Sequence, residues 1–168
     1  MNQPFILTLD LEPALARTLN ALRKRYFPPE RNFLAAHVTL FHALPSDQET
    51  TLRRDLETIC AHTPPFDVAL PELKHWGKGV FAVLESPELL DLRKKLAARW
   101  QVQLTPQDRR GYRPHVTIQN KVTKAEAAAL YHTLSPTWQP LTGAALGLSL
   151  WRYAGGPWTF AEAFKFSS

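Results

Sequence analysis

Two short stretches of the sequence carry the same polar residues at the same spacing: "HVTL" at 37–40 and "HVTI" at 115–118. Alternate side chains of an extended strand share a face, so each stretch presents a histidine and a threonine together. The ordinary pKa of histidine is about 6.5, so near neutral pH one imidazole can accept a proton while another donates one. This set suits a reaction at phosphorus, in which a base deprotonates water and an acid protonates the departing oxygen.

The four polar residues divide into two roles. His37 and His115 are the candidate acid and base, and the hydroxyls of Thr39 and Thr117 can hold the non-bridging oxygens of a phosphate. By the same alternation, His42 falls on the apolar side of its strand, and we interpret it as structural. A single His-x-Thr is more often a packing or surface feature, whereas two copies favour a functional site.

The sequence offers no metal site beside these residues. It contains no HExxH or CxxC pattern and only one cysteine, so the two histidines lack an obvious third protein ligand for zinc. We therefore expect neither a metal ion nor another cofactor.

The elements that must position the two pairs are also repeated. Each half of the chain reads as strand, helix, His-Val-Thr strand, helix, strand, and His115 follows His37 by 78 positions while Pro87 follows Pro13 by 74. Helix starts are predicted at Pro13, at a capping box in 46–49, at 86–87 and at a capping box in 123–126. Strands are predicted at 5–11, 37–44, 66–73, 79–85, 115–122, 143–153 and 158–166, the last two joined by a turn at 154–157. Such a duplication predicts two lobes related by a pseudo-two-fold axis, with a site between the two His-Val-Thr strands.

Composition limits the class of protein. With 168 residues, of which 45% are hydrophobic and 21% charged, the chain fits one domain over residues 1–168. The start lacks a secretory signal, the single cysteine cannot form an internal disulfide, and no segment is apolar enough to cross a membrane, so we expect a cytoplasmic protein. The net charge of +5 favours an anionic partner such as RNA or a nucleotide.

Several aromatic and basic residues are candidates for substrate binding. Tyr112 and Arg113 precede the second motif and could stack on a base and contact a phosphate, or they could belong to an ordinary solvated loop. Trp151 and Tyr153 have small residues as neighbours on their strand face, which would leave space for a base, although a strand tryptophan more often packs. Trp76 either borders the groove or closes a turn.

"HVTL" at 37–40 and "PHVTI" at 114–118, in a chain of this length and duplicated plan, resemble the paired motifs of the two-histidine (2H) phosphoesterase superfamily. Its branch of RNA 2',3'-cyclic phosphodiesterases is also called the 2'-5' RNA ligases. The resemblance implies an α+β, bilobal fold whose antiparallel sheets form a central groove with helices outside. It also implies that His37 and His115 are the catalytic pair and that Thr39 and Thr117 bind the phosphate. The implied reaction opens a 2',3'-cyclic phosphate to a 2'-phosphate, with 2'-5' ligation as its reverse.

The sequence departs from the pattern after the second motif. Some members carry an arginine there, whereas this chain has "QNK" at 119–121. By alternation Lys121 shares the face of His115 and could contact the substrate, as a point charge without the bidentate fork of arginine. We expect a monomer that acts on an RNA end or a cyclic nucleotide. Two alternatives remain open: a non-catalytic basic module that binds RNA or nucleotides, and a phosphodiesterase for a cyclic nucleotide unrelated to RNA.

Overall fold

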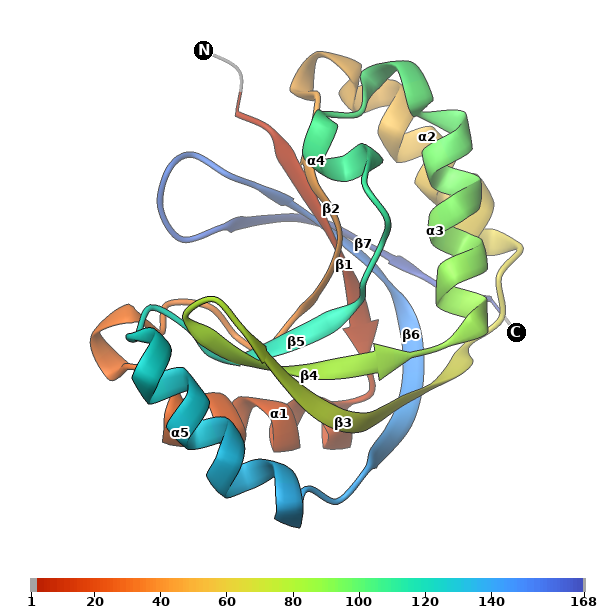
Figure 1. The fold of residues 1–168 in the computed structure, drawn as a ribbon. Helices are drawn as coiled ribbons and strands as arrows, with labels where there is room; N and C mark the ends of the chain where they lie inside the picture. The colour runs from red at the N-terminus through yellow and green to blue at the C-terminus, as the bar shows by residue number, and fades with distance from the viewer. Residues whose placement is uncertain (1–2, 168) are drawn as a thin grey trace.

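The structure is a computed structural model that describes residues 3–167. Within these residues the chain forms seven strands and five α-helices, interspersed along the sequence (Figure 1). The strands are β1 (Phe5–Leu11), β2 (Val38–Leu44), β3 (Phe66–Trp76), β4 (Gly79–Glu85), β5 (His115–Gln119), β6 (Leu141–Arg152) and β7 (Thr159–Lys165). The helices are α1 (Pro13–Tyr26), α2 (Glu49–Ala61), α3 (Pro87–Arg99), α4 (Pro106–Arg109) and α5 (Lys124–Leu134).

All strands pair antiparallel, in the order β2-β1-β6-β3-β4-β5, and β7 pairs with β6. Read backwards, this order exchanges β1 with β4, β2 with β5 and β6 with β3, as a pseudo-two-fold axis between β3 and β6 requires. The predicted α+β class with antiparallel pairing is confirmed. The lobes do not hold separate sheets, because Phe66–Leu70 pairs with Leu141–Ala145 and joins all seven strands into one.

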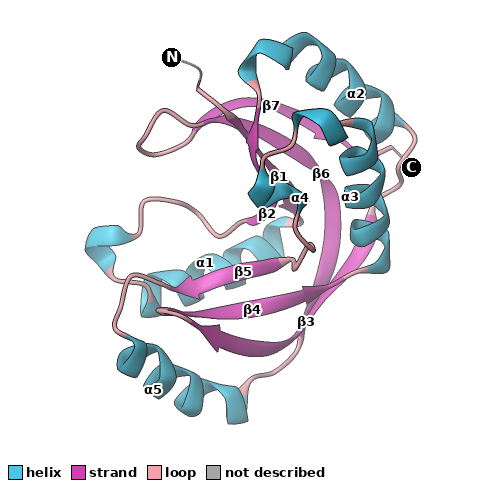
Figure 2. Cartoon of the chain, turned by 45° about the horizontal axis from the view of Figure 1, so that its top comes forward, coloured by secondary structure: helices cyan, strands magenta, loops and turns pink. Residues whose placement is uncertain are grey.

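The helices interlock the two lobes. Helix α1 leaves β1 and packs against β5 and β6, whereas α5 covers β3 and β4. Helices α2 and α3 lie side by side over the other part of the sheet, and together the four long helices surround it from outside (Figure 2). Thus α1 and α3 each follow a strand of one lobe and cross to the other. Within the described residues, no helix has the length and apolar character to cross a membrane.

The helix starts follow their local sequence signals, with one exception. The hydroxyl of Ser86 accepts the backbone N–H of Leu89 at the start of α3, and Thr123 and Glu126 form the predicted capping box of α5. The predicted capping box at 46–49 is wrong. Residues 46–48 form a separate 3₁₀ turn, so Gln48 immediately precedes α2 and no side chain caps that helix.

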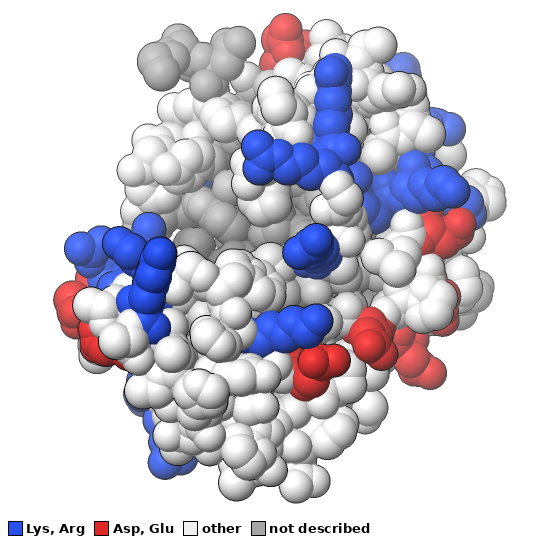
Figure 3. Space-filling model, viewed as in Figure 1, with Lys and Arg blue, Asp and Glu red and all other residues white. Residues whose placement is uncertain are grey.

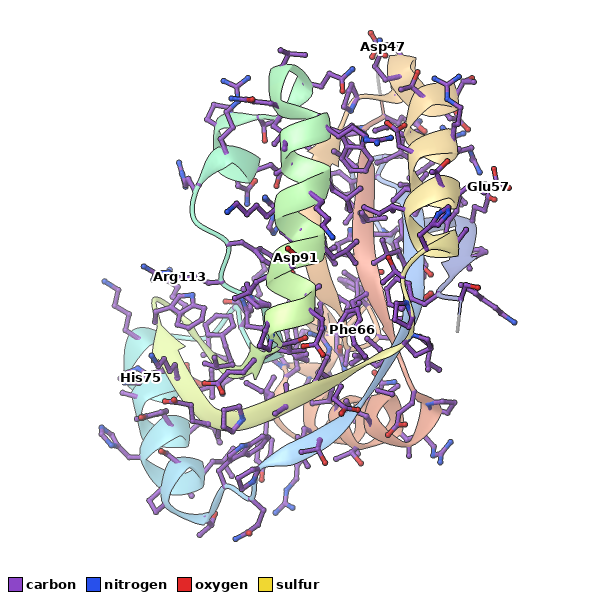
Figure 4. All side chains as sticks on the ribbon, turned by 90° about the vertical axis from the view of Figure 1, so that its right-hand side faces the viewer. Asp47, Glu57, Phe66, His75, Asp91 and Arg113 are labelled. Atoms are coloured by element: carbon purple, nitrogen blue, oxygen red, sulfur yellow. The ribbon has the colours of Figure 1, made fainter. Side chains whose placement is uncertain are left out.

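The core fills the space between the sheet and the helices. Buried leucines of α2 and α3 pack there with Phe66, which lies beneath these helices in Figure 4. At the end of α3, the indole of the buried Trp100 donates to Asp55 of α2 at 3.0 Å, and Arg99 bonds the other carboxylate oxygen at 3.0 Å. These two hydrogen bonds to Asp55 hold the C-terminal end of α3 against α2.

Candidate active site

A cleft of about 450 Å³ lies between the lobes and contains both predicted pairs. His37 lies directly before β2 and Thr39 lies within it, while His115 and Thr117 lie on β5. On the face seen in Figure 3, Lys and Arg side chains stand on both sides of the hollow, and the Asp and Glu side chains lie away from it. The structure therefore brings the four residues together in basic surroundings.

Each motif ends in a β-bulge at its aliphatic residue. Between Thr39 and Phe41 the register against β1 skips Leu40, and between Thr117 and Gln119 the register against β4 skips Ile118. A bulge bends its strand and shifts the alternation of its side chains by one residue. Both aliphatic residues are fully buried, so the motif side chains on the other face point into the cleft.

The two imidazoles are held by the same type of hydrogen bond, from Nδ1 to a nearby backbone carbonyl. Nδ1 of His37 lies 2.9 Å from the carbonyl oxygen of Ala35, and Nδ1 of His115 lies 2.7 Å from that of Arg113, in each case two residues upstream. A carbonyl only accepts, so each Nδ1 carries the proton and each Nε2 is available to take or give one. Within residues 3–167, neither Nε2 nor the hydroxyls of Thr39 and Thr117 make a hydrogen bond.

The surroundings lower the pKa values of both histidines by different amounts. Burial, opposed by the bond to Ala35 and assisted by the charges of Arg23, His115 and His42, lowers the pKa of His37 to about 4. Burial also lowers the pKa of His115, again against its carbonyl bond and with help from the charge of His42. His37 is therefore the stronger candidate for the neutral, proton-accepting partner.

A tryptophan stands beside each histidine. The ring of Trp158 meets that of His37 edge-on at 4.7 Å between centroids, and Trp76 meets His115 edge-on at 5.4 Å. Trp76 thus borders the cleft. Sequence reasoning missed Trp158, although it directly follows the predicted turn at 154–157, where the β6–β7 hairpin returns over the cleft.

The predicted placement of Trp151 and Tyr153 in the groove needs correction, because neither residue lines the cleft. The indole of Trp151 donates to the hydroxyl of Thr8 at 2.9 Å, and its ring packs beside Trp158 and Phe160. The Trp151 side chain therefore packs against Trp158, which itself lines the cleft. Tyr153 follows the end of β6 on the exposed hairpin.

Tyr112 and Arg113 both line the cleft, as predicted, but their surroundings differ. The phenol of Tyr112 donates to the carbonyl of Thr39 at 2.9 Å and ties the segment before β5 to β2. Burial raises the pKa of this phenol. Arg113 is exposed, and in Figure 4 it lies on the same side of the molecule as His75.

Lys121 does not share the face of His115. Strand β5 ends at Gln119, and Lys121 has a left-handed backbone with φ of 65°. Lys121 does not line the cleft but a second cavity, which His37 and Thr117 line as well. The bulge at Ile118 and the end of the strand explain why simple alternation failed here.

Two buried arginines, which sequence reasoning missed, fix the motif strands from the crossing helices. Arg23 of α1 donates from Nη1 to the carbonyl of Thr117 at 2.9 Å, and Arg93 of α3 donates from Nε to that of Leu40 at 2.8 Å. Each helix thus holds the motif strand of the opposite lobe. A signal was present, because Arg23 continues the four-residue spacing of Leu15 and Leu19 on the buried stripe of its helix.

The predicted placement of His42 on the apolar side of its strand is wrong. The bulge at Leu40 reverses the alternation, so the His42 side chain is exposed and lines the cleft. Its Nδ1 lies 3.2 Å from a carboxylate oxygen of Asp108, which is buried on α4. Within the described part of the chain, no three His, Cys, Asp or Glu residues are grouped so as to hold a metal ion.

An antiparallel sheet built about a pseudo-two-fold axis, with a histidine and a threonine from each half facing one cleft, is the arrangement of the two-histidine phosphoesterases. A sequence profile of the 2'-5' RNA ligase superfamily matches residues 11–157, and the chain belongs to this superfamily. No protein with a curated description matches it.

Solved structures agree on the fold. The crystal structure of Escherichia coli LigT complexed with 3'-AMP superposes with a TM-score of 0.68 at 19% identity, over 100% of both chains. A crystal structure described as a phosphoesterase gives 0.69 at 19% identity, also over 100% of both chains. A protein of Thermus thermophilus gives 0.69 at 18% identity, over 99% of this chain and 98% of its own. At these identities the likeness shows the fold alone.

Proposed function

We propose that the protein is a phosphodiesterase that opens 2',3'-cyclic phosphates, at RNA ends or in nucleotides, to 2'-phosphates without the aid of a metal ion. The observation that carries this proposal is the pair of imidazoles in one cleft, each with Nδ1 fixed by a carbonyl and Nε2 without a partner in the described residues. Membership of the 2'-5' RNA ligase superfamily supports the substrate class.

The proposed reaction uses the two histidines on opposite sides of phosphorus. Nε2 of His37 takes a proton from water as its oxygen attacks, and Nε2 of His115 gives a proton to the departing 3' oxygen. The P–O bond to that oxygen breaks as the new one forms, leaving a 2'-phosphate and a 3'-hydroxyl. The hydroxyls of Thr39 and Thr117 donate to the non-bridging oxygens and hold the phosphate in line for attack. In 2'-5' ligation a 5'-hydroxyl takes the place of water: its oxygen attacks phosphorus and gives its proton to the base, and the 3' oxygen again departs, while the 5'-hydroxyl is the leaving group when that linkage is cleaved.

The nucleotide part of the substrate is supported by two further observations. Crystal structures of Escherichia coli LigT hold 3'-AMP, ATP or phosphate, so a protein with this fold accepts ligands of this chemistry. In the present protein, Trp76 and Trp158 border the cleft beside the histidines, and exposed aromatic rings can stack on bases.

The test compares the wild type with His37→Ala and His115→Ala on adenosine 2',3'-cyclic phosphate, and measures binding of adenosine 2'-monophosphate to all three proteins. Each variant is expected to lose about 10²- to 10⁴-fold in kcat, because each loses one proton-transfer group, and to keep measurable binding. A wild type that binds the nucleotide but shows no turnover would support the non-catalytic module instead. Activity equal to that of the wild type in either variant would overturn the mechanism.

A further inference from the structure

The cleft contains a third imidazole that the proposed reaction does not use. His42 follows the bulge of β2, and about half of its side chain, 48%, is exposed. Beneath it lies the carboxylate of Asp108, whose side chain is 0% exposed. This is the one carboxylate among the described residues that line the cleft.

The position of Asp108 is fixed from several sides. Its carboxylate accepts the backbone N–H of His42 at 2.9 Å and that of Ala43 at 3.0 Å, besides the imidazole. Arg93 donates to its backbone carbonyl at 2.7 Å. Burial alone would raise the pKa of Asp108, but the hydrogen bonds from His42 and Ala43 lower it below the ordinary value. A buried, ionised carboxylate therefore orients the His42 ring.

This partner distinguishes His42 from the other two histidines. An ionised carboxylate only accepts, so Nδ1 of His42 carries a proton. The other ring nitrogen, Nε2, is the one left to meet a ligand in the cleft, and it donates an N–H in the doubly protonated ring. Because carbonyls rather than carboxylates hold His37 and His115, a division of roles follows: those two exchange protons, and His42 is suited to hold an anion.

Two exposed arginines, Arg110 and Arg113, stand on the same wall. Within the described residues, neither guanidinium takes part in a hydrogen bond or an ion pair, so both can meet a ligand. The charge of His42 lowers the pKa values of both His37 and His115, which places it within electrostatic reach of the proposed reaction centre.

We propose that His42 and Arg113 form an anion subsite for a second phosphate of the substrate, carried on the 5' oxygen of the nucleoside whose cyclic phosphate is opened. The proposal rests on the proposed function. The 2' and 3' oxygens of that nucleoside are occupied by the cyclic phosphate, so the 5' oxygen is where a ribonucleotide bears another. The second phosphate is either a free 5'-monoester or the diester that links the nucleoside to an RNA chain.

The experiment measures binding of product analogues by calorimetry, without turnover. Adenosine 2'-monophosphate is compared with adenosine 2',5'-bisphosphate and with a diadenosine chain ending in a 2'-phosphate. The wild type is expected to bind at least one of the two longer ligands about tenfold more tightly than the monophosphate, as one charge-assisted hydrogen bond allows. A gain for the bisphosphate assigns the subsite to a free monoester, and a gain for the dinucleotide alone assigns it to the chain diester.

Variants separate His42 from general charge effects. His42→Gln and, independently, Arg113→Gln are expected to reduce the affinity ratio toward one, with melting temperatures recorded to verify folding. His62→Gln, which changes an exposed histidine at the end of α2, is the matched control and keeps the wild-type ratio. Equal affinities for all three ligands in the wild type, or an unchanged ratio in both subsite variants, would overturn the proposal. Absence of turnover with the affinity ratio intact would instead count against the proposed function alone.

Discussion

The depressed pKa of His37 should make the stability of the protein depend on pH in a way that one substitution removes. In the unfolded chain the imidazole titrates near 6.5, whereas in the folded protein its pKa is about 4. Between these values the unfolded chain binds a proton that the native state does not. The contribution of the neutral, folded His37 is therefore fully present above about pH 6.5 and is lost as the pH falls toward about 4.

The size of the effect follows from the two values. Between about pH 7.5 and about pH 5, this single group should lower the free energy of unfolding by about 2 kcal/mol. Such a loss moves a urea midpoint by about 1 M, because a domain of this size has a slope of about 2 kcal/mol per molar urea. Carboxylates titrate in the same range and add their own effect, so the comparison must be made between proteins.

Urea unfolding of the wild type and of His37→Gln at both pH values isolates the contribution of this histidine. The variant is expected to lose about 2 kcal/mol less stability on acidification than the wild type, whatever its stability at about pH 7.5. His62→Gln, at an exposed helix end, serves as the control. If His37→Gln and the wild type lose the same stability, the pKa of His37 is not depressed, and its assignment as the base fails.

Three further predictions follow from the site. First, kcat/KM should already fall as the pH rises toward about 6.5, because the pKa of His115 lies below its ordinary value of 6.5 and the free enzyme loses the acid's proton as the pH rises through that lowered pKa. A profile that stays flat to about pH 8 would exclude this acid. Second, Thr39→Val and Thr117→Val should each lower kcat about 10- to 100-fold, because each removes a hydroxyl from the phosphate while keeping the shape of the side chain; unchanged rates in both variants would remove the hydroxyls from the mechanism. Third, Tyr112→Phe should lower the free energy of unfolding by about 1 kcal/mol, since it removes the bond to the carbonyl of Thr39; a urea midpoint equal to that of the wild type would show that this bond contributes nothing.

The parts of the fold that could be predicted depend on local sequence. Pro13, Ser86 and Thr123 mark the starts of α1, α3 and α5, because the groups that cap a helix lie within a few residues of its end. The two motifs could be found for the same reason, since alternation along a strand needs only the sequence itself. The duplication also predicted, without any structural information, that the elements of the two halves correspond to each other.

Features that depend on pairing between distant strands could not be predicted in this way. The bulge at Leu40 exists only in the register of β2 against β1, and it decides that His42 faces the cleft. The bulge at Ile118 likewise breaks the alternation before Lys121, and this residue lines a second cavity. The indole of Trp151 bonds the hydroxyl of Thr8 on the neighbouring strand β1. That contact could not be predicted, because it depends on which strand lies beside β6.

The central claim, opening of a cyclic phosphate by two histidines, is tested most directly by the product of the wild-type protein. Adenosine 2',3'-cyclic phosphate is incubated with the protein, with and without EDTA, and the phosphorus NMR spectrum identifies the phosphate isomer that forms. We predict adenosine 2'-monophosphate as the sole product, at the same rate in both samples. Formation of the 3'-monophosphate, a rate abolished by EDTA, or no reaction at all would contradict this claim.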